Sequence, residues 1–158
     1  MTRSRDELPL SETQRTLPIA LLRAREAVME RFRPMLRDID VTEQQWRVLT
    51  VVREAEEIDA TQLARAACVL APSLTRTLKS LESRGLITQG RDKNDRRRTL
   101  VRMTEAGDAL LHQAEVVSAR IYADIEAKLS AKRIAQLLEA LERLTEDLRT
   151  QENARSGD

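Results

Sequence analysis

The feature that most constrains the fold is a pair of short amphipathic helical segments with only three residues, VLA, between them. The first segment, ATQLARAAC (60–68), follows an Asp59–Gln62 helix-start signal, and the second, PSLTRTLKSLESRG (72–85), begins with a proline. Gly85 predicts that the second helix ends in a left-handed residue. Two short helices joined by a tight turn are typical of a helix-turn-helix motif.

A β-hairpin is predicted directly after the second helix. Residues 86–90 (LITQG) and 99–103 (TLVRM) indicate two short strands, and the loop RDKNDRRR (91–98) joins them. A hairpin following a helix-turn-helix gives its winged form. The sequence therefore predicts a mainly α fold with a small β-hairpin wing.

Long amphipathic helices flank this motif. Thr16 begins a predicted helix to about residue 37, in which Pro34 is expected to bend or break the last turn, and residues 104–149 predict two further helices. We expect one domain over residues 16–150, with the winged helix-turn-helix over 42–103, a flexible arm at 1–15 and a flexible tail at 151–158. Pairing the apolar stripes of the terminal helices across a two-fold axis predicts a homodimer; packing of the first helix against the last within one chain is the alternative.

Charge is concentrated in the predicted reading helix and wing. Residues 76–102 contain nine Lys or Arg residues against three Asp or Glu, a net charge of +6, whereas the whole chain has a net charge of +1. Such a block is the expected electrostatic footprint of nucleic-acid binding. A triple arginine can also be merely a solvated charged face, but its place at a wing favours double-stranded DNA as the partner.

Catalysis and metal binding have little support in the composition. The chain has one cysteine, one histidine and four glycines, too few for common metal, nucleophile–base or phosphate-loop arrangements. We expect no enzyme activity, no metal and no cofactor. Since no apolar run is long enough to span a bilayer and no signal peptide is recognisable, we expect a cytoplasmic protein without membrane contact.

Geometry assigns DNA-binding roles within the second helix and the wing. Leu74, Leu78 and Leu81 share one face and are expected to be buried, which turns other side chains outward. A helix N-terminus can approach phosphates, and an arginine can read guanine in the major groove. The predicted DNA-binding residues of the helix are Pro72, Ser73, Thr75, Arg76, Thr77 and Lys79.

Two segments resemble the MarR family of winged helix-turn-helix regulators. DRRRTLVRMTEAG (95–107) is similar to the family's wing signature, and LKSLESRGLI (78–87) to the end of its recognition helix. The resemblance covers about residues 16–150 and implies an obligate homodimer with interlocked first and last helices. It also implies that Arg97 enters a minor groove, that Asp95 braces it, and that Arg98 adds a phosphate contact.

A narrower resemblance concerns the effector. Residues 20–34, 42–49 and 67–76 resemble family members that control homoprotocatechuate (3,4-dihydroxyphenylacetate) degradation and sense hydroxylated aromatic acids. This implies a repressor that a small aromatic carboxylate releases from a pseudo-palindromic operator.

Arg25 is the residue that suggests where the acid binds. It interrupts an apolar stripe of the first helix, and a buried guanidinium needs an anion. A ligand carboxylate is one candidate; Glu26, Glu30 or a carboxylate of a partner subunit are the others. The predicted effector-binding residues are Arg25, Met29, Phe32, Trp46 and Arg47.

Two other functions remain open. One is an oxidant-sensing regulator that uses Cys68, although that cysteine is predicted to be a small buried hydrophobic residue. The other is a helical adaptor that uses the basic block to dock a protein rather than DNA.

Overall fold

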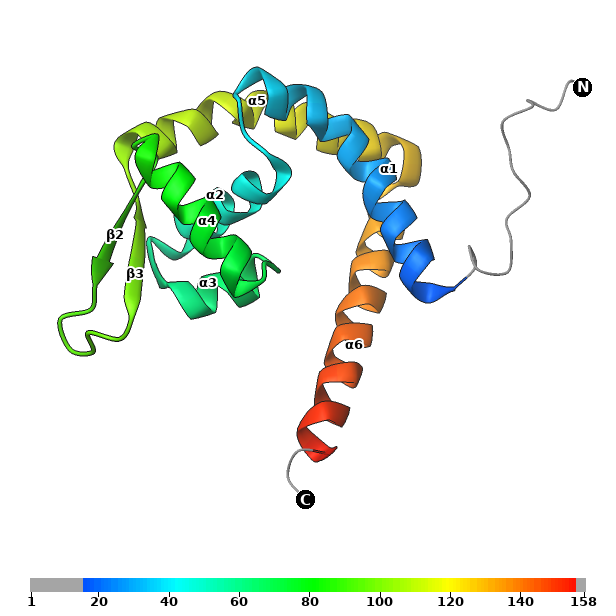
Figure 1. The fold of residues 1–158 in the computed structure, drawn as a ribbon. Coiled ribbons are helices and arrows are strands. Elements are labelled where there is room, and N and C mark those ends of the chain that lie inside the picture. Colours follow the sequence, from blue (N-terminus) through cyan, green and yellow to red (C-terminus); the bar gives the residue numbers. More distant parts are fainter. Residues whose placement is uncertain (1–15, 156–158) are drawn as a thin grey trace, which may run out of the picture. The chain divides into compact units, whose positions relative to one another are not determined.

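The computed structural model describes residues 16–155, with side chains up to residue 150 (Figure 1). The predicted arm at 1–15 and the end of the predicted tail, 156–158, lie outside this range. The elements in chain order are α1 (Leu17–Asp38), α2 (Glu43–Ala55), β1 (Glu57–Asp59), α3 (Ala60–Ala66), α4 (Ala71–Ser83), β2 (Ile87–Arg91), β3 (Thr99–Met103), α5 (Glu105–Leu129) and α6 (Ala131–Arg155).

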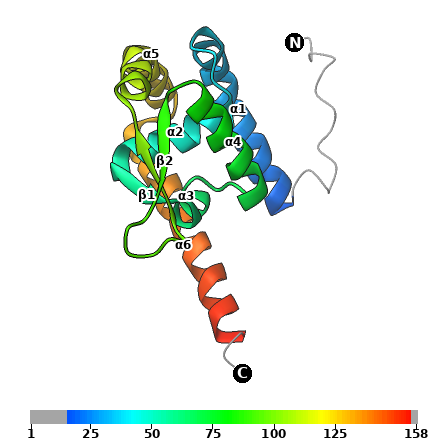
Figure 2. The ribbon, with the colours of Figure 1, turned by 60° about the vertical axis from the view of Figure 1, so that its left-hand side comes forward.

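These elements form two compact units that divide after Glu115, within α5. The first unit contains the helix-turn-helix, α3 and α4, and an antiparallel sheet of order β1–β3–β2 (Figure 2). The mainly α architecture with a β-hairpin wing is thus confirmed.

Strand β1 was not predicted. Ile58 lies opposite Val101 of β3, on the edge of β3 away from β2. The acidic segment around it has the composition of an exposed connector, and three residues are too few to show strand periodicity. Because β1 pairs with β3 and directly precedes α3, it connects the base of the wing to the start of α3.

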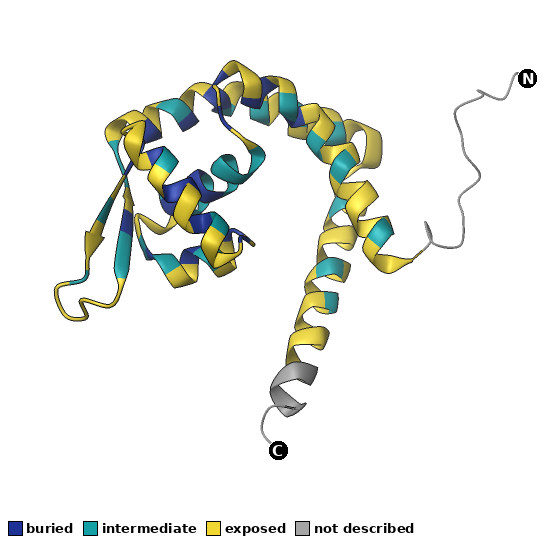
Figure 3. Ribbon diagram, viewed as in Figure 1, coloured by how far each residue is buried: buried dark blue, intermediate teal, exposed yellow. Residues whose placement is uncertain are grey.

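The core of the first unit is built from the apolar faces that the sequence predicts. Buried side chains come from α2, α3, α4, the strands and the adjoining parts of α1 and α5 (Figure 3). The largest side chains that are less than 2% exposed are Leu49, Leu63, Leu81, Ile87, Leu111, Val48, Val52 and Val101. In α2, Leu49 and Val52 are buried, whereas Trp46 is only half-buried.

Local signals set most helix boundaries. Thr42 and Gln45 form a capping box at the start of α2, Asp59 accepts a hydrogen bond from the Gln62 N–H (2.9 Å), and Gly85 has a φ of +70°. Helix α1 continues through Pro34 to Asp38, so of the two predicted effects of this proline a break does not occur. Helix α6 continues to Arg155, past the predicted start of the tail.

A tight joint connects the end of α4 to the start of α5. The Thr104 hydroxyl donates to the Gly85 carbonyl (2.7 Å) and accepts from the Gly107 N–H (3.1 Å), and the Thr104 N–H donates to the Leu86 carbonyl (3.1 Å). A side chain at position 107 would place its Cβ 2.1 Å from the Leu86 carbonyl oxygen. Glycine is required here because the backbone of the α4–β2 connection approaches too closely for any side chain.

The second unit consists of the remainder of α5 and α6. Ser130 lies between them with a φ of +66°, and its hydroxyl caps α6 by accepting from the Arg133 N–H. The large exposed apolar side chains of the second unit are Val116, Val117, Tyr122, Leu129, Leu137, Leu138 and Leu148.

Candidate nucleic-acid interface

Helix α4 presents two chemically different faces. Leu74, Leu78 and Leu81 are buried, as their spacing predicts. Four predicted DNA-binding residues are exposed and a fifth, Ser73, is half-buried; the exposed ones are Pro72, Thr75, Arg76 and Lys79. The first unit therefore offers a helix with an apolar inner face and a polar, cationic outer face.

Thr77 does not belong to that outer face. Its side chain is buried, its hydroxyl donates to the Ser73 carbonyl (2.9 Å), and it accepts from the Gln44 Nε2 (2.6 Å). One helical turn further on, the Gln45 Nε2 donates to the Ser80 Oγ (3.2 Å). Thr77 thus fixes α4 against α2, and we remove it from the predicted DNA-binding set.

The turn between α3 and α4 also departs from the prediction. Cys68 is exposed, because its left-handed φ of +51° at the end of α3 turns its side chain away from the core. The Arg47 guanidinium donates to the carbonyls of Ala67 (3.1 Å) and Cys68 (3.3 Å). Arg47 therefore satisfies carbonyls at the end of α3 through one terminal nitrogen, whereas its Nε is buried and has no hydrogen-bond partner among the residues that the structure describes.

The cations of the basic block divide into two groups. Four are held within the first unit: Arg84 donates to the Asp40 carbonyl (2.7 Å), Arg91 to the Arg96 carbonyl (2.7 Å), Arg98 to Asp59 (2.8 Å) and Arg102 to Glu57. Five have side chains with no hydrogen-bond or ion-pair partner among the side chains and backbone described over residues 16–150: Arg76, Lys79, Lys93, Arg96 and Arg97. The second group has cationic side chains that make no such contact in the described part of the chain and can turn fully toward an external polyanion.

Asp95 shapes the wing turn through the backbone. Its carboxylate accepts from the Arg97 N–H (3.0 Å) and its carbonyl accepts from the Arg98 N–H (2.9 Å). It was expected to orient the Arg97 guanidinium. The contact is instead an Asx-type turn that fixes the direction of the chain, leaving the Arg97 side chain exposed.

Arg98 anchors the wing rather than pointing freely outward. Its Nε donates to Asp59 Oδ2, and the other Asp59 oxygen caps α3. The Arg98 hydrogen bond, followed by the Gln62 N–H, lowers the pKa of Asp59, and the same pair raises the pKa of Arg98. One carboxylate therefore ties the wing to the helix-turn-helix.

We predict that this tie weakens in acid. Because the folded pKa of Asp59 is below its ordinary value of 3.8, its stabilising effect is complete above about pH 4 and is lost as the pH falls through the folded pKa. Asp59→Asn keeps a helix-capping side chain but removes the charge. Urea unfolding should show the wild type more stable than Asp59→Asn at pH 7 and the difference reduced at pH 3. An equal difference at both values would show that the charge of Asp59 contributes nothing.

The predicted effector residues are only partly brought together. Arg25 is exposed and pairs with Glu26 (3.1 Å), one of its predicted alternatives, and with Glu43 of α2 (2.6 Å). Phe32 is buried in the core, Met29 and Trp46 are half-buried, and Arg47 caps α3.

Arg33 and Glu43 belong to the same charge cluster and were not predicted from the sequence. Arg33 pairs with Glu26 and with Glu43 (2.7 Å), and the Arg33 hydrogen bond lowers the pKa of Glu43. Because Arg33 and Glu43 lie on two different helices, their separation of ten positions in the sequence does not indicate that they are in contact. The Arg25–Glu26–Arg33–Glu43 cluster joins α1 to the first turn of α2.

Two negative findings apply to the residues that the structure describes. No three His, Cys, Asp or Glu side chains lie close enough together to hold a metal ion, and none of the helices is both long and apolar enough to cross a membrane.

A helix-turn-helix followed by a hairpin with free arginines defines a winged helix-turn-helix DNA-binding protein. The model of the MarR family matches residues 41–99. The homoprotocatechuate degradative operon repressor of Escherichia coli is 40% identical over 127 residues, which are 80% of this chain and 86% of that protein. The chain belongs to the MarR family and is a transcriptional regulator.

Solved structures agree with this assignment. NadR in complex with 4-hydroxyphenylacetate is 34% identical, with a TM-score of 0.75 over 87% of this chain and 97% of NadR. The repressor CouR bound to a 23-mer DNA duplex is 28% identical, with a TM-score of 0.77 over 88% of this chain and 99% of CouR.

Proposed function

We propose that this MarR-family protein represses an aromatic-acid catabolic operon. Its operator is a pseudo-palindrome, read by the outer face of α4 in the major groove and by the wing in the flanking minor groove. The observation that carries this proposal is that Arg76 and Arg97 have exposed side chains without a hydrogen-bond or ion-pair partner within residues 16–150. The Gln44–Thr77 hydrogen bond holds α4 in place, and the Asp95 turn holds the wing. The proposal implies a cytoplasmic protein without enzyme activity.

A homodimer is part of the proposal. Helix α1 exposes Leu17, Leu21, Leu22 and Val28, and the second unit exposes its own apolar side chains. Burying such surface drives association, and two-fold symmetry would supply two reading helices for two half-sites.

The proposed effector is a small hydroxylated aromatic acid such as homoprotocatechuate. Support comes from the name of the Escherichia coli relative and from the 4-hydroxyphenylacetate complex of NadR. The predicted set Arg25, Met29, Phe32, Trp46 and Arg47 stays a prediction, in which Phe32 is buried in the core and one nitrogen of Arg47 donates to carbonyls at the end of α3. Release requires that the acid bind the DNA-incompetent conformation more tightly.

Titration of the protein against its own upstream DNA tests this function. We expect tight binding that 3,4-dihydroxyphenylacetate weakens, whereas 4-methylcatechol, which lacks the carboxylate, leaves it unchanged. Tight binding that the acid does not affect would remove the effector proposal, and treatment with mild peroxide would then test Cys68. Absence of binding at low salt would remove the regulator proposal and favour the adaptor.

A further inference from the structure

The turn between α3 and α4 carries an exposed leucine. Leu70 is 78% exposed, more than any other large apolar side chain among the residues that the structure describes. The other large exposed apolar side chains lie on α1 or in the second unit, where the proposed dimer offers them a partner surface. Leu70 instead lies immediately before the reading helix α4. Its exposure therefore needs a different explanation.

The local backbone directs the Leu70 side chain out of the core. Leu70 lies four residues before the buried Leu74, so a longer helix would place it on the same buried stripe. Its φ of −66° and ψ of 143° are extended, and the helix begins only after it. Val69 is buried instead, and Val69 and Leu74 occupy the two positions of a hydrophobic staple. The core is thus closed without Leu70.

Leucine is also a poor residue for a helix start. Leu70 is the N-cap of α4, and its hydrocarbon side chain cannot accept a hydrogen bond from the first N–H groups of the helix. Thr42 and Asp59 provide such an acceptor for α2 and α3. Neither the core nor the helix start accounts for a leucine at position 70.

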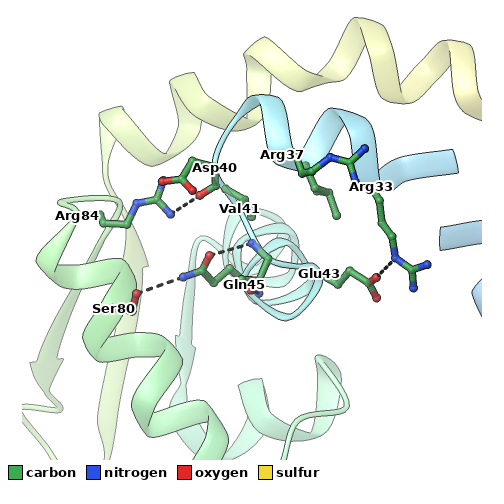
Figure 4. Close-up of a pocket in the computed structure, with 10 residues that line it drawn as sticks. Arg33, Arg37, Asp40, Val41, Glu43, Gln45, Ser80 and Arg84 are labelled. Atoms are coloured by element: carbon green, nitrogen blue, oxygen red, sulfur yellow. Dashed lines mark hydrogen bonds and ion pairs between the residues drawn. The ribbon is translucent and has the colours of Figure 1, made fainter. Parts of the chain in front are cut away.

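Contacts within the first unit hold the C-terminal end of α4 and leave its start uncovered. The Gln45 Nε2 donates to the Ser80 Oγ (3.2 Å), and Arg84 donates to the Asp40 carbonyl (2.7 Å) (Figure 4). The start of α4, next to Leu70, lies on the same side of the first unit as the wing loop, the lower side in Figure 1.

The charge around Leu70 favours a polyanion as the partner that covers it. The sequence has no Asp or Glu between Asp59 and Glu82, whereas this stretch contains Arg65, Arg76 and Lys79. All three cations are exposed. A surface with cations and without carboxylates fits the phosphates of DNA, and an apolar side chain among those cations requires an apolar group on the same partner.

The methyl group of thymine meets this requirement, because it is the only hydrocarbon group that base pairs present in the major groove. The N-terminal residues of a reading helix come nearest to the base edges. We propose that Leu70 contacts a thymine methyl group in each half-site and is a specificity-determining residue of this protein. The inference rests on the proposed function, since it takes α4 as the reading helix.

Uracil substitution in the operator tests this contact, because uracil pairs as thymine does but lacks the methyl group. A series of duplexes carries uracil in place of one thymine at equivalent positions of both half-sites. Each duplex is titrated with the wild type, with Leu70→Ala and with Cys68→Ala. The last is the matched control, because Cys68 is exposed two positions earlier in the same turn.

We expect one thymine position at which uracil weakens wild-type binding about fourfold per half-site, and at which Leu70→Ala loses less than about twofold. Cys68→Ala should show the wild-type loss. Equal responses of the wild type and Leu70→Ala at every thymine would overturn the inference while leaving the proposed function intact. Absence of wild-type binding to every duplex would contradict the proposed function, and the inference with it.

Leu70→Ser separates the contact from protein stability. Since serine can cap α4, we expect the melting temperature to rise by about 2–4 °C while the affinity for the thymine operator falls as in Leu70→Ala. Unchanged operator affinity of this variant would overturn the inference. A shift from dimer to monomer in sedimentation would also overturn it, because Leu70 would then be covered by a second copy of the chain.

Discussion

Gly107→Ala is expected to destabilise the protein by about 3 kcal/mol or more, at the upper end of overpacking effects. The new Cβ would lie 2.1 Å from the Leu86 carbonyl oxygen and 2.4 Å from the Met103 sulfur. The methionine side chain can move, but the carbonyl belongs to the backbone that links α4 to the wing. Displacing it also breaks the Thr104 hydrogen bonds that join α4 to α5.

Two other glycines provide matched controls for this prediction. Position 90, in β2, has open space around a Cβ, so Gly90→Ala should be neutral or slightly stabilising. Position 85 is also open but has a φ of +70°, so Gly85→Ala should cost about 1 kcal/mol through backbone strain. Urea unfolding of the three variants checks the order. A Gly107→Ala variant as stable as Gly90→Ala would contradict the described joint.

Arg76→Ala and Arg97→Ala are expected to weaken operator binding strongly but in different ways. Removing the Arg76 side chain from α4 removes a hydrogen bond to a base, which costs roughly 1–3 kcal/mol per half-site and relaxes the preference for one base pair. Removing the Arg97 side chain from the wing weakens binding to all duplexes. Since a dimer presents each side chain twice, the slope of log affinity against log salt concentration should also become less steep by about two.

Arg84→Ala is the internal comparison for this pair. Arg84 lies in the same basic block, but its guanidinium donates to the Asp40 carbonyl and lies 3.9 Å from the Asp40 carboxylate. Binding isotherms at several salt concentrations, with operator and scrambled duplexes, separate the three variants. If Arg84→Ala lowers the salt slope as much as Arg97→Ala, the division of the block into held and free cations is wrong.

Local signals allowed most of the fold to be predicted from the sequence. The Thr42 capping box, the Asp59 cap and Gly85 each specify a backbone conformation within a few residues. The leucine spacing of α4 likewise determines which face is buried. Helix α1 passes through Pro34 because the packing of Phe32, Met35 and Leu36 on both sides of it stabilises the last turn beyond what the proline costs.

The partners of charged residues could not be predicted in the same way. The sequence shows three consecutive arginines at 96–98, but it does not show that Asp59, far away along the chain, lies beside Arg98 and not beside Arg97. Thr77 was assigned to DNA for the same reason, because its hydrogen bond from Gln44 depends on how α2 crosses α4. Such pairings are set by tertiary packing rather than by spacing.

Hydroxyl-radical footprinting of the upstream DNA at low salt tests the central claim most directly. We predict two protected half-sites about one helical turn apart, each with a protected minor groove on its outer side. With Arg97→Ala the outer protections should be lost while the two half-sites remain protected. Uniform protection without half-sites, or none at all, would contradict the account of a dimer that reads DNA through α4 and the wing.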